Sequence, residues 1–283
     1  METRTTWNIL KETVQQWLAD DAATLAASLA FYTAISIAPL LIMVIVVASI
    51  FVSRQQVVEN QLMTYLTNNI GAQGAQFIQN IINNAEQPSA STIAGIVSLV
   101  TLIWGSTNVF TQLQNTLNKI WNVDEQGGSG IWNTLQERFL AFAMVLGIAF
   151  LLLLSLVISA VLSTIATSFS NLLGGMSWLW QLVDFLISFG VITLLFAAVF
   201  KVLPDVELAW RDVWLGAGVT ALLFVIGKFL LGFYLGNATS AYGAAGSLIA
   251  FLLWVYYSAQ ILFFGAEFTQ VYTGRDRNSA VAS

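Results

Sequence analysis

The chain has 283 residues, of which 57% are hydrophobic and only 9% charged, with a formal net charge of −5 and neither cysteine nor histidine. Soluble domains carry about 25% charged residues, so a chain this poor in charge cannot cover a globule with polar surface and must be solvated in part by lipid. The two missing residue types exclude disulfides, thiolate catalysis, HExxH zinc sites and Ser-His or Cys-His nucleophiles. No basic tract indicates nucleic-acid binding, and we expect no metal or cofactor.

Six apolar segments follow a polar start, and each is about as long as the roughly 20 residues that cross a bilayer core. The predicted spans are residues 29–52, 92–111, 139–164, 178–201, 212–236 and 243–271. The prediction is therefore one all-α, polytopic membrane domain over residues 1–283.

Amphipathic segments flank the first span. In residues 1–28, Trp7, Leu10, Val14 and Trp17 recur at helical spacing, which predicts a helix on the membrane surface rather than a signal peptide. Residues 53–91 hold two short apolar stripes, which we expect to pack at the outer interface; a recognition domain for another envelope protein is the alternative. A further stripe with Phe110, Leu117 and Trp121 follows the second span.

Lysine and arginine are unequally distributed between the two sides of the predicted spans. Eight lie on the side that holds both termini, and Arg54 alone lies on the other. Cytoplasmic loops carry the excess of basic residues, so both termini are expected in the cytoplasm.

Pro39 lies well inside the first span. Proline lacks an N–H group and clashes with the preceding turn, so the helix should bend there, and Ser36 is placed to hydrogen-bond a freed carbonyl. A structural kink is the more common explanation in membrane helices; a hinge is the alternative.

Small residues mark the last two spans, and they let helices approach closely. Span five has Gly216, Gly218, Gly232 and Gly236, and span six begins with Gly243, Gly246, Ser247 and Ala250. The pattern predicts packing of span five against span six, or a seam that allows a homodimer without requiring one.

Apart from Lys201 and Asp212 at the span ends, three charged residues lie within the predicted spans, where such groups are functional candidates. Lys228 and Asp184 fall at similar depth on neighbouring antiparallel spans, so they are predicted to face the same polar interior; Lys228 extending its side chain outward is an equally weighted alternative. Glu267 lies near the cytoplasmic end of the last span. We expect it to be an interfacial carboxylate satisfied by water or by a basic residue such as Lys201.

Several stretches resemble the BrkB/YihY family of bacterial inner-membrane proteins. They are "AASLAFYTAISIAPLL", "LNKIW", "LPDVELAWRDVWLGAGVTALLFVIGKFLLGFY" and "YGAAGSLIAFLLWVYYSAQILFFGAEFTQVY". The resemblance implies six transmembrane helices with cytoplasmic ends in the inner membrane, and a role in moving lipopolysaccharide or other envelope lipids. It supplies no catalytic residues, and it leaves Asp184 outside the matching stretches. The name ribonuclease BN, carried by some members, conflicts with a chain that has no histidine.

Two classes of function remain open. A transporter-like protein handling an envelope lipid, an anionic amphiphile or an anionic solute fits bent helices and a polar interior, and no GxxxxGK[ST] motif is present for nucleotide binding. The alternative is a membrane scaffold or envelope assembly factor. An enzyme is not expected, because no paired carboxylates, metal-ligand spacing or serine dyad are found.

Overall fold

The computed structural model describes residues 6–51, 63–64, 66–67, 72, 74–80, 83, 108–123, 177–238 and 245–274. Within these ranges all regular structure is helical. The long elements are α1 (Thr6–Ala19), α2 (Ala22–Phe51), α6 (Ser177–Val202), α7 (Trp210–Ala238) and α8 (Gly246–Thr273), and residues 108–120 form a further helical segment.

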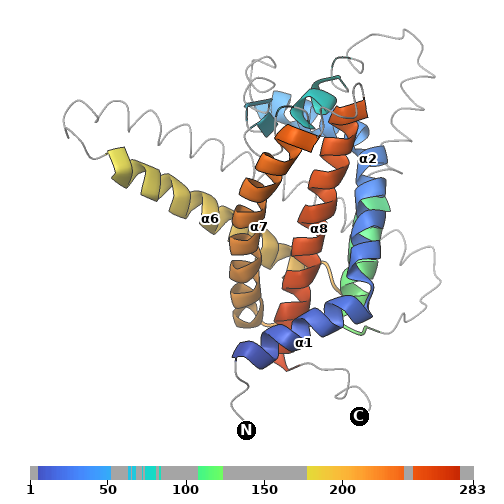
Figure 1. The fold of residues 1–283 in the computed structure, drawn as a ribbon, viewed down its shortest axis with the longest axis vertical. Helices are drawn as coiled ribbons and strands as arrows, with labels where there is room; N and C mark the ends of the chain where they lie inside the picture. Colours follow the sequence, from blue (N-terminus) through green and yellow to red (C-terminus); the bar gives the residue numbers. More distant parts are fainter. Residues whose placement is uncertain are drawn as a thin grey trace.

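The bundle is organised around α8, which packs against α2 on one side, α7 on the other and α1 near its last turns (Figure 1). α7 and α8 run antiparallel, and α6 leans away from both, with its first turns farthest from the bundle (Figure 1). We call the end that holds α1, the starts of α2 and α7 and the last turns of α8 the α1 end.

Three of the described helices contain stretches long and apolar enough to cross a membrane. These are Phe185–Val202, Trp210–Tyr234 and Gly246–Thr273, and Ala22–Ser36 in α2 is a shorter apolar stretch. The helices that contain them, α6, α7 and α8, agree with predicted spans four, five and six to within three residues, which is consistent with the predicted helical membrane protein. Predicted span three and most of span two lie outside the described residues, and the count of six spans stays a prediction.

The first long helix starts earlier than the sequence pattern indicated. α1 ends at Ala19 and α2 begins at Ala22, whereas we placed the start of the span at residue 29. Asp21 makes the corner between the helices with a positive φ of 54°, a conformation that aspartate tolerates better than most residues. Its carbonyl oxygen accepts the Thr24 N–H at 2.9 Å, which starts α2 at once.

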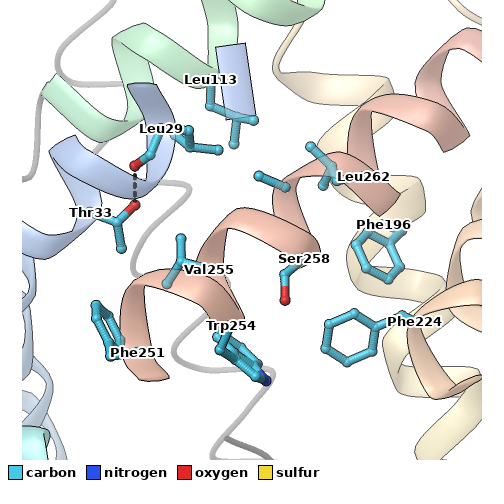
Figure 2. A pocket seen from close by; sticks show the side chains of 11 residues that line it. Leu29, Thr33, Leu113, Phe196, Phe224, Phe251, Trp254, Val255, Ser258 and Leu262 are labelled. Atoms are coloured by element: carbon cyan, nitrogen blue, oxygen red, sulfur yellow. Dashed lines mark hydrogen bonds between the residues drawn. The ribbon is translucent and has the colours of Figure 1, made fainter. Parts of the chain in front are cut away.

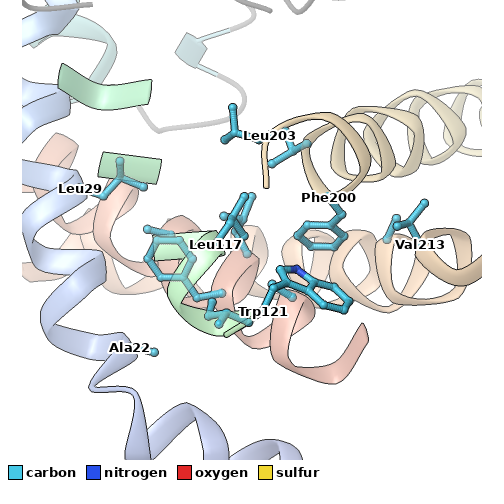
Figure 3. Packing of buried hydrophobic residues seen from close by; sticks show 14 of the residues in the cluster. Ala22, Leu29, Leu117, Trp121, Phe200, Leu203 and Val213 are labelled. Atoms are coloured by element: carbon cyan, nitrogen blue, oxygen red, sulfur yellow. The ribbon is translucent and has the colours of Figure 1, made fainter. Parts of the chain in front are cut away.

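The α1 end holds the main hydrophobic core. Ala22 and Leu29 of α2, Leu117 and Trp121, Phe200 of α6 and Val213 of α7 are buried in one cluster (Figure 3). The stripe that follows span two is therefore buried in protein. Hydrogen bonds tie it in place. Asn118 Nδ2 donates to Asp205 Oδ2 at 2.7 Å, and Lys119 Nζ donates to the Asp20 carbonyl oxygen at 2.7 Å.

A reciprocal glycine–threonine contact joins α7 to α8. A Cβ atom added at Gly216 would lie 1.7 Å from Thr269 Oγ1, and one added at Gly265 would lie 1.8 Å from Thr220 Oγ1. Each threonine hydroxyl donates to the carbonyl oxygen of the glycine four residues earlier in its own helix, at 2.7 Å in both cases. The hydroxyls are thus satisfied within their helices while their side chains fill the notches opposite.

Replacing Gly216 with alanine should destabilise the protein, because the added methyl group has no space beside Thr269. We expect a loss of about 1–3 kcal/mol in the free energy of unfolding, the usual cost of overpacking. Gly218→Ala is the matched control, since nothing lies within 4 Å of a Cβ at that position. Denaturation of both variants in detergent micelles measures the difference, and equal stability would contradict this packing.

Candidate functional site

A cavity of about 260 Å³ lies between the helices midway along α8 (Figure 2). Its walls come from α2, the 108–120 segment, α6, α7 and α8. The lining residues are Leu29, Thr33, Leu113, Phe196, Phe224, Phe251, Trp254, Val255, Ser258, Ala259 and Leu262. The cavity is partly open and almost wholly apolar, which suits part of a hydrocarbon chain rather than a polar solute.

Aromatic rings form the wall on the α6 and α7 side. The rings of Phe196 and Phe224 pack edge to face with their centroids 5.8 Å apart, and those of Phe224 and Trp254 do so with their centroids 6.2 Å apart. This geometry is favourable for aromatic pairs, so a single row of rings links α6, α7 and α8 at the level of the cavity.

Two hydroxyl groups lie in this apolar wall, from Thr33 and Ser258. Thr33 Oγ1 donates to the Leu29 carbonyl oxygen at 2.7 Å, as the dashed line in Figure 2 shows. Ser258 instead directs its hydroxyl toward the space between Trp254 and Phe224 (Figure 2).

Lys228 is half-buried on α7, four residues after Phe224. Residues four apart in a helix share a face, so Lys228 follows the cavity-lining face by one turn, away from the α1 end. Lys228 thus lies on α7 one turn beyond the Phe224 wall of the cavity.

The structure does not test the predicted meeting of Lys228 with Asp184. The side chain of Asp184 lies outside the described residues, although its backbone belongs to α6. The adjacent residues Val183 and Phe185 are exposed, as is Leu186. The shared polar interior stays a prediction.

Glu267 differs from the expected interfacial carboxylate. Its side chain is 0% exposed, so water cannot satisfy it within this fold. Lys201 Nζ donates to the carbonyl oxygen of Leu208 and not to Glu267. The difference arises because α1, packed against α8, covers the last turns of α8, a tertiary contact that the linear pattern did not reveal.

The hinge residues are partly described. Ser36 is 2% exposed, and α2 continues as one helix through Pro39, whose side chain lies outside the described residues. Whether this position moves stays a prediction.

The glycines predicted to pack between helices have different surroundings in the structure. Gly246 is buried in the first turn of α8, but nothing lies within 4 Å of a Cβ at Gly232, so Gly232 does not form the α7–α8 contact. Gly243 and the surroundings of Gly236 lie outside the described residues. The contact uses Gly216, which is one of the predicted glycines, and Gly265, which is not. A GxxxT spacing on both spans was the signal that would have identified it.

No group of three or more acidic residues that could hold a metal ion occurs in the part of the chain that the structure describes. The site is therefore an apolar cavity with a few polar groups at its edge.

Filling the cavity should be tolerated where filling the core is not. Ala259 lines the cavity, whereas Ala266, two turns further along α8, is 0% exposed within the hydrophobic core. We expect Ala259→Leu to leave the melting temperature in detergent unchanged or raised, and Ala266→Leu to cost about 1–3 kcal/mol of stability. Equal destabilisation by the two variants would show that the space beside Ala259 is not open.

The chain is similar in sequence to known membrane proteins along nearly its whole length. Residues 13–282 match the family model described as virulence factor BrkB. A UPF0761 membrane protein of Psychrobacter sp. (strain PRwf-1) is 28% identical over 278 residues, 95% of this chain and 49% of that protein. One of Ralstonia nicotianae is 29% identical over 92% of this chain and 59% of that protein.

A third relative is close to this chain in length. The UPF0761 membrane protein of Actinobacillus pleuropneumoniae serotype 5b is 28% identical over 92% of this chain and 91% of that protein. The chain thus spans about half to three fifths of the first two relatives and about nine tenths of the third. No solved structure matches.

Proposed function

Because the chain belongs to the BrkB family of membrane proteins, we propose that it is a transporter-like protein that handles an anionic amphiphile or envelope lipid within the bilayer. The observation that carries the proposal is the apolar cavity midway along α8, with Lys228 one turn beyond its Phe224 wall. Transporters place their substrate sites near the bilayer midplane, and this cavity lies midway along a helix of 28 residues, which supports the proposal.

The two parts of the site fit the two parts of an amphiphile. The aromatic walls favour a hydrocarbon chain, and a volume of about 260 Å³ holds a segment of such a chain. Lys228 supplies positive charge at the edge of the cavity, where electrostatic attraction is stronger than at a water-exposed surface. A neutral, fully apolar ligand would not use this charge.

Orientation and location belong to the same proposal. We propose that the protein lies in a bacterial inner membrane with the α1 end, and with it both termini, in the cytoplasm. The distribution of basic residues supports this orientation, since Lys11, Lys119, Lys201 and Arg211 all belong to the segments gathered at the α1 end.

A membrane scaffold or envelope assembly factor is the second candidate. The observation that favours it is the tight α1 end, where the core, the Asn118–Asp205 hydrogen bonds and the Gly216–Thr269 contact lock the helices together. A scaffold needs such rigidity and has no use for a charge beside an apolar cavity. The role of Lys228 therefore separates the two candidates.

Replacing Lys228 with methionine should remove the preference for anionic amphiphiles while the protein stays folded. The probes are oleoyl lysophosphatidate and zwitterionic oleoyl lysophosphatidylcholine, with binding to nanodisc-embedded protein measured by native mass spectrometry. We expect the preference of the wild type for the anionic probe to fall about tenfold or more, the usual worth of a hydrogen bond to a charged group.

Lys11→Met is the matched control, because Lys11 is exposed on α1, far from the cavity, and should leave the preference unchanged. Lys228→Arg should retain it. An undiminished preference in Lys228→Met, together with movement of labelled lysophosphatidate in wild-type proteoliposomes no faster than in protein-free liposomes, would favour the scaffold.

The absence of native cysteine allows a direct test of orientation. Trp7 is 70% exposed on α1, and Ala245 is exposed at the start of α8, at the opposite end of the bundle. With a membrane-impermeant maleimide, we expect Ala245→Cys to react in intact cells and Trp7→Cys only after permeabilisation. The reverse pattern would place the α1 end outside the cytoplasm.

A further inference from the structure

The two hydroxyl groups that line the cavity, those of Thr33 and Ser258, differ in the hydrogen bonds they make. Thr33 Oγ1 donates to the Leu29 carbonyl oxygen at 2.7 Å, the usual way for a helix to satisfy a hydroxyl. Ser258 Oγ makes no hydrogen bond within the described ranges. A hydroxyl that makes no hydrogen bond among aromatic side chains, midway along a membrane helix, carries a cost in free energy. A ligand oxygen that accepts a hydrogen bond from it would therefore be strongly favoured there.

The register of α7 and α8 fixes the depth of this hydroxyl. Gly216 lies opposite Thr269, and Thr220 lies opposite Gly265, so four residues forward on α7 correspond to four residues back on α8. Continuing this antiparallel register by seven residues brings Gly227 level with Ser258. Ile261 Cδ1, 2.7 Å from a Cβ built on Gly227, agrees with contact continuing to this level.

Ser258 therefore lies at the same depth as Lys228, the residue after Gly227. Lys228 shares a helical face with the cavity-lining Phe224, and Ser258 directs its hydroxyl toward the space between Trp254 and Phe224 (Figure 2). A ligand whose charged group is held by Lys228 thus meets the serine hydroxyl within a few bonds of that charge. The apolar remainder of the cavity accommodates its chain.

We propose that Ser258 is a ligand-binding residue that donates a hydrogen bond to an acyl carbonyl oxygen, so that the amphiphile bound here is an acyl-linked anionic lipid. This inference rests on the proposed function. An ester carbonyl in a single-chain acyl phosphate lies a few bonds from the phosphate, which matches the common depth of Ser258 and Lys228. Alkyl ethers and isoprenoid phosphates have no such carbonyl, so they leave the serine unsatisfied and bind less well.

The test compares two probes that differ only where the chain joins glycerol, because a methylene group in one replaces the ester carbonyl of the other. Oleoyl lysophosphatidate carries an ester carbonyl, and its oleyl ether analogue does not. Binding of each to the full chain in nanodiscs is measured by native mass spectrometry, for the wild type, Ser258→Ala and Thr33→Val. Thr33→Val is the matched control, because it removes a hydroxyl from the same cavity that is already used by its own helix.

We expect the wild type to bind the ester about three- to tenfold more tightly than the ether, the effect of one net hydrogen bond. Ser258→Ala should abolish this preference by weakening the ester alone, and Thr33→Val should preserve it. Both variants replace a small side chain with a similar or smaller one, and melting temperatures confirm that they fold.

Two results would overturn the inference. Equal binding of ester and ether to the wild type, or an ester preference that survives in Ser258→Ala, would show that the serine does not recognise the carbonyl; the proposed function would stand if the anionic preference still depended on Lys228. Failure of both probes to bind would overturn the proposed function and the inference with it.

Discussion

The packing of α7 against α8 depends on two threonine side chains that each fit against a glycine of the other helix. Because Gly216 and Gly265 have no side chain, the helix backbones approach closely there, and Thr269 and Thr220 fill the space. The threonine hydroxyls donate within their own helices, so the contact leaves no polar group to be satisfied by lipid. This contact determines the relative depth of every residue along both helices, including Lys228 and the cavity wall.

Burial along α8 follows from that contact. Its second half is largely enclosed by α1, α2 and α7, and even Glu267 and Gln270 are buried there. Its first half is only partly covered, and the cavity lies where the enclosed half begins. The molecule thus combines a closely packed base at the α1 end with an open space midway along the helices. α6 diverges from the bundle as it leaves this base (Figure 1).

The sequence predicted the elements well and their contacts poorly. Long apolar runs placed α6, α7 and α8 to within a few residues, because the length of a span is set by the bilayer. Apolar runs do not say which face meets which neighbour, so the cavity and the burial of Glu267 were not predictable from them. The start of α2 at Ala22 depends on the corner at Asp21, a local backbone feature. The glycine–threonine contact was present as GxxxT on both spans. Counting glycines alone included Gly216 but missed Gly265, and it also included Gly232, which has open space around it.

The most direct test of the account is an experimental structure of the full chain in lipid nanodiscs, supplemented with oleoyl lysophosphatidate and examined at the cavity. We expect elongated density between Phe224, Trp254 and Val255, with its polar end beside Lys228. A cavity closed by the surrounding side chains, with Lys228 turned outward to the membrane interface, would contradict the amphiphile-handling account and favour a scaffold.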